Sequence, residues 1–217
     1  MKKLKMKKNN MPGMLITFCG LDGCGKTTML RRLADALSGE HELFITKQPT
    51  PFVRMSDIFR TYMDCPDHSA YDYRSLSLLA ASDRIQHVMS EILPALAEGK
   101  IVLCDRYFYS CLANLRARGY KDDRWIYEIA EHVVEPDIAF FFDAGVDTAV
   151  SRVRSREDEK DRYIDIKLQI NLREQYKEIC RRNGGVMIST EIPAEDTYSE
   201  VISRVKKEMS KYYGRKR

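Results

Sequence analysis

The chain has 217 residues, of which 44% are hydrophobic and 31% are charged, and its formal net charge is +4. This is the composition of an ordinary globular protein, and it excludes a chain that is disordered throughout. No apolar run approaches the ~20 residues that a membrane-spanning helix needs, and no apolar segment of a signal peptide follows the basic N-terminus, so we expect a cytoplasmic protein without a membrane partner.

Positive charge is concentrated at the two ends of the chain, because five of the first eight residues are lysines and the last three are Arg215, Lys216 and Arg217. Runs of this kind are usually solvated tails. We therefore predict a disordered basic tail over residues 1–12. The charges elsewhere are mixed, so we expect no nucleic-acid partner. Residues 13–213 contain no repeat and no linker, which predicts a single domain.

Short apolar runs alternate with longer amphipathic stretches, a pattern typical of a parallel sheet covered by helices. Residues 14–19 are almost wholly apolar and precede a glycine, which predicts a buried strand. Helical spacing of apolar residues follows over 26–37, and residues 42–46 form a second short strand. Pro49 and Pro51 then predict an extended loop, because proline disfavours a helix at its own position and at the residue before it.

The longest helical pattern covers residues 71–97, and Gly99 is placed to end that helix. A third strand is predicted at 101–104, directly before Asp105. One continuous apolar stripe at spacings of three and four marks the buried face of the long helix: Leu78, Ala81, Ile85, Val88, Ile92 and Leu96.

The rest of the chain completes an α/β pattern with five strands and helices on both faces of the sheet. The predicted helices cover residues 122–134, 146–155, 164–182 and 198–212, and the predicted strands cover 138–142 and 186–188. The six cysteines form no C-x-x-C pair and no zinc spacing, so we interpret them as reduced and mostly buried thiols.

The segment Gly20–Thr27 fits the pattern G-x-x-x-x-G-K-[ST] between a predicted strand and a predicted helix, which is the context of a phosphate-binding P-loop. Glycines let backbone N–H groups turn toward phosphates, and the helix N-terminus adds partial positive charge. Lys26 can reach the β- and γ-phosphates of ATP, and the Thr27 hydroxyl can bind Mg²⁺. At a helix N-terminus a thiolate is favoured, so we expect Cys24 to be the most reactive cysteine. The nucleotide-binding residues predicted here are Gly20, Leu21, Asp22, Gly23, Cys24, Gly25, Lys26, Thr27 and Thr28.

Asp105 follows four apolar residues of the third predicted strand, the form of a second nucleotide-site strand. Behind a P-loop, such a carboxylate is expected near the metal, together with Thr27. The alternative is a carboxylate that caps or orients the following segment. The chain contains no N-K-x-D motif, which disfavours a guanine-specific GTPase.

Four further segments accompany the P-loop: Ala81-Ser-Asp-Arg84 in the long helix, the sequence ILPALAEGK that begins at Ile92, Cys104-Asp-Arg-Tyr107, and Asp161-Arg-Tyr163 after an arginine-rich stretch. Together they make nearly the whole chain resemble the thymidylate kinase family. The resemblance implies a five-stranded parallel sheet of the P-loop fold, a lid at about residues 150–163, ATP and Mg²⁺ as cofactors, and a homodimer. The implied reaction is phosphorylation of a nucleoside monophosphate, in the family's case dTMP to dTDP.

The resemblance also implies roles for single residues. Asp22 matches a carboxylate near the acceptor sugar and the metal, and Arg106 matches the arginine that grips the acceptor phosphate, a task for which its planar fork is well suited. Arg84 matches an arginine that approaches the nucleobase. Near it we expect Ser110, Cys111 and Asn114 to bind the acceptor.

One more cation is needed to neutralise the negative charge that develops on the transferred phosphoryl group. Some relatives carry an arginine in the P-loop for this, where this chain has Gly23. We therefore expect the lid to supply it. Arg152 and Arg156 are favoured over Arg154, because residues four apart share one face of a helix.

The chain departs from the family pattern at several positions. Lys47-Gln48-Pro49-Thr50 stands where many members have R-E-P-G, and Ala80 replaces an aromatic residue that often stacks on thymine. Asn114-Leu115 replaces a Tyr-Gln pair, although Phe52 or Tyr109 could supply the missing ring. These changes leave open a kinase for another monophosphate, or for a nucleoside or other small alcohol. A nucleotide-binding regulatory protein without transfer activity is the third possibility.

Overall fold

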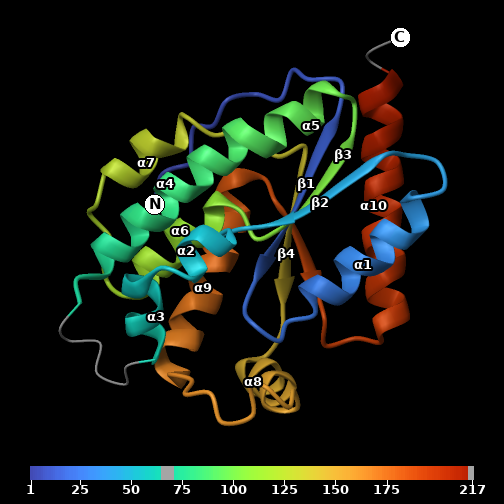
Figure 1. Ribbon diagram of the computed structural model, residues 1–217. Coiled ribbons are helices and arrows are strands. Elements are labelled where there is room, and N and C mark those ends of the chain that lie inside the picture. Colours follow the sequence, from blue (N-terminus) through green and yellow to red (C-terminus); the bar gives the residue numbers. More distant parts are fainter. Residues whose placement is uncertain (65–70, 215–217) are drawn as a thin grey trace.

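The computed structural model describes residues 1–64 and 71–214 (Figure 1). Its centre is one five-stranded parallel sheet with the strand order β2-β3-β1-β4-β5, which confirms the predicted fold class. In register, Lys47 at the end of β2 lies beside Asp105 at the end of β3. The strands are β1 (Met14–Gly20), β2 (Leu43–Lys47), β3 (Ile101–Asp105), β4 (Ile138–Asp143) and β5 (Val186–Ser189).

Helices cover both faces of the sheet, so that the apolar side chains of β1, β3 and β4 are buried in the core. On one face lie α1 (Lys26–Leu37) and α10 (Ala194–Gly214), which pack against each other. The opposite face carries α6 (Phe108–Ala117) and α9 (Ile166–Asn183). Helix α8 (Val146–Arg154) crosses the carboxyl end of the sheet, where β4 points toward it in Figure 1.

The long helix predicted for residues 71–97 consists of three consecutive segments. They are α4 (Tyr73–His87), a π-helical turn η1 (Val88–Ile92) and α5 (Leu93–Ala97). The π-turn shifts the hydrogen-bonding pattern directly before Pro94, which has no N–H to donate, and the Leu93 N–H donates to the carbonyl of Val88. The predicted apolar stripe is buried except at Ile85, which is partly buried, and at Leu78, which is 46% exposed.

Other local predictions were wrong. The extended loop expected at Pro49 and Pro51 contains a short helix, α2 (Pro51–Arg54), because proline is well placed in a first helical turn. The helix expected over 122–134 is reduced to α7 (Trp125–Ala130). Two helices were not predicted: α3 (Asp57–Asp64) and α6, which is apolar on nearly all sides and shows no amphipathic stripe.

Residues 1–12 pack against the domain, unlike the disordered tail that their composition predicts. Leu4 is 2% exposed, and its N–H donates to the Asn183 side chain at the end of α9. The backbone of Lys7 exchanges hydrogen bonds with residues Val133 and Glu135, and Asn9 donates to the Asp137 carboxylate. Regular backbone pairing and a buried leucine therefore outweigh the repulsion of the lysines, whose side chains are mostly exposed.

Two further expectations concern the whole chain. The described cysteines, Cys19, Cys24, Cys104, Cys111 and Cys180, are free and buried, whereas Cys65 lies outside the described residues. Within residues 1–64 and 71–214, no helix has the length and apolar character needed to cross a membrane.

Candidate active site

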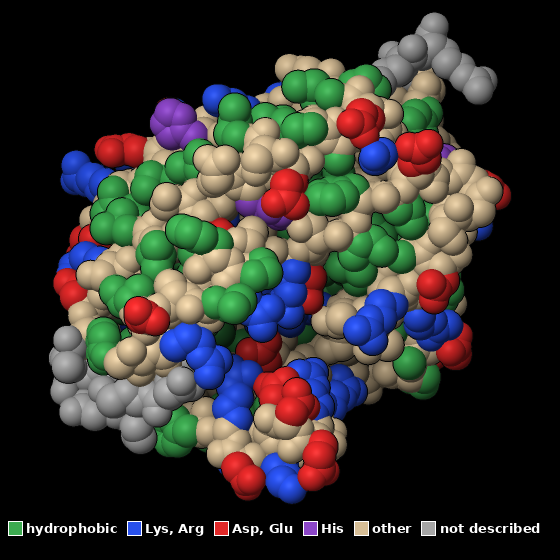
Figure 2. Space-filling model, viewed as in Figure 1, with side chains coloured by type: hydrophobic (Ala, Val, Ile, Leu, Met, Phe, Trp, Pro, Cys, Tyr) green, Lys and Arg blue, Asp and Glu red, His purple; other side chains and the backbone are tan. Residues whose placement is uncertain are grey.

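Polar side chains converge at the carboxyl ends of β1 and β3, where a small cavity of about 80 Å³ opens beside the start of α1. Figure 2 shows lysine and arginine side chains gathered around a recess at this end of the molecule. Parallel strands bring residues that are distant in sequence to one edge of the sheet, so this is the expected place for a ligand. The cavity is lined by Asp22, Gly23, Gly25, Lys26, Thr27, Thr28, Lys47, Asp105, Arg106 and Arg156.

The loop between β1 and α1 has the shape of a phosphate cradle. Gly25 precedes α1 with a φ of 86°, a left-handed conformation that favours glycine. A Cβ atom at Gly23 would lie 2.1 Å from the carbonyl oxygen of Ala149 in α8, so only glycine allows this approach. The first N–H groups of α1 have no partner within the helix and are available to an anion. Lys26 is 5% exposed, and its ammonium donates to the Leu21 carbonyl at 2.6 Å.

The Cys24 side chain is fully buried within this loop. Burial raises the pKa of its thiol, and the nearby charge of Lys26 only partly opposes this shift. Burial of the Cys24 sulfur therefore opposes the thiolate that a helix N-terminus favours.

Thr27 and Asp105 form a pair of oxygen ligands suited to Mg²⁺. The Thr27 hydroxyl donates to Oδ2 of Asp105 at 3.1 Å, and the Lys47 ammonium lies 3.7 Å from the same oxygen. Oδ1 of Asp105 is buried and has no hydrogen-bond partner among the described residues. One carboxylate and one hydroxyl, completed by water and phosphate oxygens, are a common protein contribution to a Mg²⁺ site.

Arg106 and Asp22 form an ion pair at the centre of the site. Arg106 has a φ of 67°, a left-handed conformation that no other described non-glycine residue adopts. Its guanidinium also donates to the Tyr176 hydroxyl at 3.3 Å. The charge of Arg106, followed by those of Lys26 and Arg162, holds the pKa of Asp22 well below its usual range, although partial loss of water around the carboxylate opposes the shift. Asp22 is therefore ionised at neutral pH.

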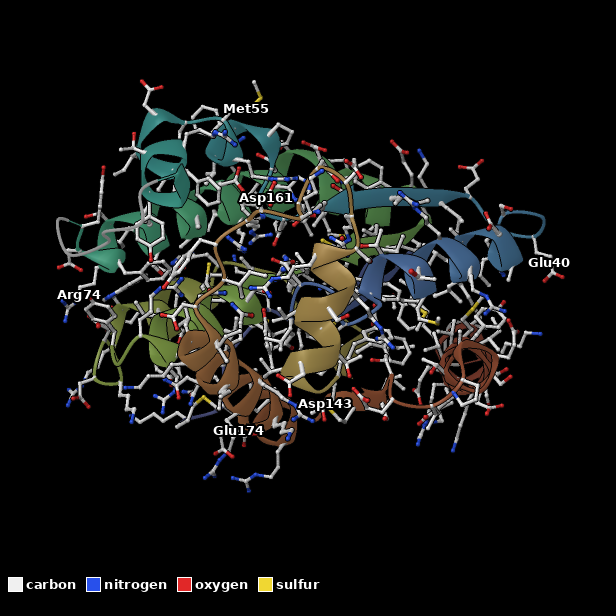
Figure 3. The ribbon with its side chains drawn as sticks, turned by 90° about the horizontal axis from the view of Figure 1, so that it is seen from below. Glu40, Met55, Arg74, Asp143, Asp161 and Glu174 are labelled. Atoms are coloured by element: carbon white, nitrogen blue, oxygen red, sulfur yellow. The ribbon has the colours of Figure 1, made fainter. Side chains whose placement is uncertain are left out.

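The three arginines predicted for the lid lie in different surroundings. The Arg152 guanidinium donates to the carbonyl of Thr190 after β5 at 3.1 Å, whereas Arg156 lines the small cavity. Helix α8 ends at Arg154, which is exposed, so Arg152 and Arg156 do not share a helical face and the reason given for choosing them was wrong. Figure 3 shows α8 and the segment that carries Asp161 lying across the carboxyl end of the sheet.

Arg162 belongs to the site although no role was predicted for it. Its guanidinium lies 3.3 Å from Oδ2 of Asp22 and 2.7 Å from Glu159. Glu159 also pairs with Arg156 at 2.8 Å and so connects the two arginines. The motif Asp161-Arg-Tyr163 was noted in the sequence. It did not predict a role for Arg162, because the return of this segment to the P-loop is a contact between residues far apart in the chain. Lys47 and Tyr176 were also not assigned to the site.

Apart from Asp22 and Arg106, the residues predicted to bind the acceptor lie on the facing helices α4 and α6. Arg84 is 3% exposed and donates to the carbonyl of Ala80 at 2.8 Å, and its Nε has no partner among the described residues. Burial raises the pKa of the Cys111 thiol, with Arg84 close enough to oppose the shift. Ser110 accepts a hydrogen bond from Tyr176 at 3.1 Å, which links this group to Arg106.

Two hydrogen bonds hold the Asn114 side chain in place on α6. Its Nδ2 donates to the Ser110 carbonyl and its Oδ1 accepts from Arg118, both at 2.9 Å. The Arg118 guanidinium stacks 3.9 Å above the Tyr73 ring and donates to the Tyr62 hydroxyl. Because arginine is only a donor and a carbonyl only an acceptor, these partners fix the orientation of the Asn114 amide. Arg118, Tyr73 and Tyr62 also line a larger cavity of about 540 Å³ between α4, α6 and α9.

The two aromatic residues that could replace the ring missing at Ala80 have different surroundings. Phe52 is 77% exposed, and Tyr109 is buried against Phe141 with ring centroids 5.3 Å apart. Another ring near this group is that of Tyr73, which lies within reach of the charges of Arg118 and Arg84.

Comparison with known proteins shows that this chain is similar to members of one family. The family model described as thymidylate kinase matches residues 18–201. The chain is 34% identical over 203 residues to a probable thymidylate kinase of Pyrococcus horikoshii, covering 92% of this chain and 98% of the relative. It is 32% identical over 182 residues to a thymidylate kinase of Bacillus licheniformis, covering 81% and 85%.

Proposed function

The chain belongs to the thymidylate kinase family, and from this premise we propose that the cavity at the carboxyl ends of β1 and β3 is where it transfers the γ-phosphoryl group of ATP to dTMP. The products are dTDP and ADP. The observation that carries the proposal is the convergence of a P-loop lysine, the Asp22–Arg106 pair and the lid arginines on one small cavity. Phosphoryl transfer needs positioning and charge neutralisation more than covalent help.

On the donor side, the N–H groups at the start of α1 and the ammonium of Lys26 bind the phosphates of ATP. Thr27 and Asp105 hold Mg²⁺, which supplies neutralisation of phosphate charge when bound. Lys26 has to leave the Leu21 carbonyl to reach a phosphate, and the flexible lysine stem permits this. Arg152, fixed on Thr190 beside the P-loop, belongs to the donor side of the lid.

On the acceptor side, Arg106 and Lys47 hold the phosphate of dTMP in line with the γ-phosphate. Arg106 supplies a rigid fork, and Lys47 supplies a charge where relatives have an arginine. Arg156 and Arg162 approach from the lid and neutralise charge on the transferred group. Their present partners Glu159 and Asp22 hold them close to that position.

The base lies between α4 and α6. The buried Nε of Arg84 has no partner within residues 1–64 and 71–214, and it can donate to a carbonyl oxygen such as O4 of thymine. Asn114, fixed by Arg118 and Ser110, offers the remaining hydrogen of its amide to the base. Cys111, three residues before Asn114 on α6, contributes a small buried side chain to this region.

We further propose that the enzyme is a cytoplasmic homodimer that acts without nucleic acid. A face built from β2, α2, α3, α4 and η1 carries exposed large hydrophobic side chains, seen as green atoms across Figure 2, and Met55 points away from the protein in Figure 3. Such a surface is unusual on a monomer and favours a second copy as its partner. Its residues are Ile45, Phe52, Met55, Ile58, Leu78 and Met89, which are between 38% and 77% exposed.

The deciding experiment measures ADP release at saturating Mg²⁺ and ATP with dTMP, dUMP, dCMP, dGMP, dAMP and thymidine as acceptors. We expect dTMP to give the highest kcat/KM and thymidine to give no turnover above background. ADP release that no monophosphate stimulates would contradict the proposal. A higher kcat/KM for another monophosphate would contradict the assignment of the acceptor alone.

A further inference from the structure

A buried polar network ties the end of β2 to helix α4. The ring of His87, which is 3% exposed, lies between two side chains of the strand end. Its Nε2 is 2.8 Å from the Thr46 hydroxyl, and its Nδ1 is 3.0 Å from the amide nitrogen of Gln48. Gln48 is fully buried, and its Oε1 has no hydrogen-bond partner among the described residues.

These partners define the protonation state of the ring. An amide nitrogen can only donate, so Nδ1 of His87 has to accept and the ring proton sits on Nε2, where it can donate to Thr46. The charged groups that act on the ring are Glu91, 3.5 Å from Nε2, and Asp83 and Arg84, all on the same long helix. From the strand, the neighbouring charge is Lys47. Burial lowers the pKa of His87 although the two carboxylates oppose this shift, so the ring is neutral at pH 7.

A second tie lies one helical turn before His87. The Asp83 carboxylate, 6% exposed, accepts hydrogen bonds from both the N–H and the hydroxyl of Thr50. The N–H of Gln48 in turn donates to the carbonyl of Asp105 at 3.0 Å. The segment 46–50 is therefore anchored at both of its ends and at its middle.

Lys47 is the residue that this anchored segment presents to the active site. It lines the small cavity with Arg106, and its ammonium faces Asp105. A lysine side chain is a flexible point charge, unlike the rigid fork of an arginine. Its position therefore depends on how firmly its backbone is held.

We propose that His87 is a positioning residue for the acceptor phosphate, because its neutral ring holds Thr46 and Gln48 and thereby sets Lys47 beside Arg106. The inference rests on the proposed function, since it assigns the phosphate of dTMP to Lys47. A proton on Nδ1 turns an acceptor into a donor that faces the amide N–H of Gln48. The Gln48 amide then has to rotate so that Oε1 faces the ring, and the amide N–H contact that holds the present geometry of the end of β2 is displaced.

The test compares wild-type enzyme with His87→Asn and His87→Leu. Asparagine keeps an acceptor near the position of Nδ1 but does not titrate, whereas leucine removes the interaction. His132→Asn is the matched control, because His132 is exposed and lies outside the site. For each enzyme, KM for dTMP, KM for ATP and kcat are measured from about pH 4 to about pH 8, a range that extends below the ordinary titration of histidine because burial lowers the pKa of His87. Thermal unfolding at each pH verifies that the variants are folded.

For His87→Leu at neutral pH we expect KM for dTMP to rise about tenfold, as for the loss of a buried hydrogen bond, with KM for ATP unchanged. For His87→Asn we expect KM for dTMP to stay close to the wild-type value. The phosphate of dTMP itself titrates near pH 6, so the informative quantity is the ratio of wild-type to variant kcat/KM. Relative to His87→Asn, the wild type should lose activity about fivefold or more toward acid pH, because only its residue 87 takes up a proton.

A constant ratio across the pH range overturns the inference, as does an equal rise of both KM values in His87→Leu. A shifted profile in His132→Asn also overturns it, because the effect is then not specific to this network. Failure of the proposed function itself is separate: the wild type would then show no ADP release that depends on dTMP at any pH.

Discussion

Arg106 carries a guanidinium at the candidate site and has an unfavourable backbone conformation. Two substitutions of Arg106 distinguish the effect of the side chain from the effect of the backbone. Its φ of 67° lies in the left-handed region, which costs a residue with a Cβ atom about 1–2 kcal/mol. Arg106→Ala keeps this cost and Arg106→Gly removes it, while both lose the ion pair with Asp22. Glycine loses about 0.5–1 kcal/mol more conformational freedom on folding. We therefore expect Arg106→Gly to be the more stable variant by about 0.5–1 kcal/mol.

Urea unfolding and thermal unfolding of the two variants measure this difference. At the size of this chain, 1 kcal/mol shifts Tm by roughly 2–4 °C, so the expected difference is detectable. In kinetics the two variants should be equal. Two lost charge-assisted hydrogen bonds to a phosphate, at about 1.5–3 kcal/mol each, lower kcat/KM for dTMP by about 10²–10⁴.

The result that refutes this reasoning is an alanine variant at least as stable as the glycine variant. Residue 106 would then not adopt the left-handed backbone conformation in solution, and this conformation would not fix the direction of the Arg106 side chain. If Arg106→Gly alone retained activity, the guanidinium would not be the group that binds the acceptor phosphate.

Three other predictions concern the P-loop, the lid and the N-terminus. Lys26→Met should lower kcat by about 10³ or more without a change in circular dichroism, and turnover above a tenth of wild type would contradict its role. Arg162→Ala should lower kcat far more than Arg154→Ala, because Arg162 reaches Asp22 and Arg154 is exposed; the reverse order in steady-state kinetics would refute the lid assignment. Deletion of residues 1–8 should lower the free energy of unfolding by about 2–4 kcal/mol, since a buried leucine and backbone hydrogen bonds are lost. No loss in urea unfolding would mean that the segment is detached in solution.

Features that depend on local patterns were predicted well from the sequence. The five strands are short apolar runs, and the P-loop carries its own glycines, so β1 and α1 were found nearly to the residue. Helix α6 was missed because a helix buried on almost every side has no polar face to reveal its period. The tail was misinterpreted because Leu4 contacts α9, far along the chain.

The same distinction explains the site. Lys26, Thr27 and Asp105 follow from motifs next to strands, and the structure brings them together. Arg162 could not be assigned because its place depends on where the chain turns after α8. The choice of lid arginines relied on a helix that ends two residues too early for Arg156.

The charges around the small cavity show why this arrangement suits two phosphorylated substrates. Its lining holds four cations, Lys26, Lys47, Arg106 and Arg156, against two carboxylates, Asp22 and Asp105. Each cation has an internal partner in the structure, and the lid arginines are held by Asp22 and Glu159. These partners allow the cations to lie close together when no substrate is bound. When phosphates bind, the cations have to exchange hydrogen bonds with these partners for hydrogen bonds with phosphate oxygens. Asp22 pairs with Arg106 from the core and with Arg162 from the lid. We therefore expect substrate binding at one arginine to change the contacts of the other, so that the P-loop carboxylate couples acceptor binding to the lid.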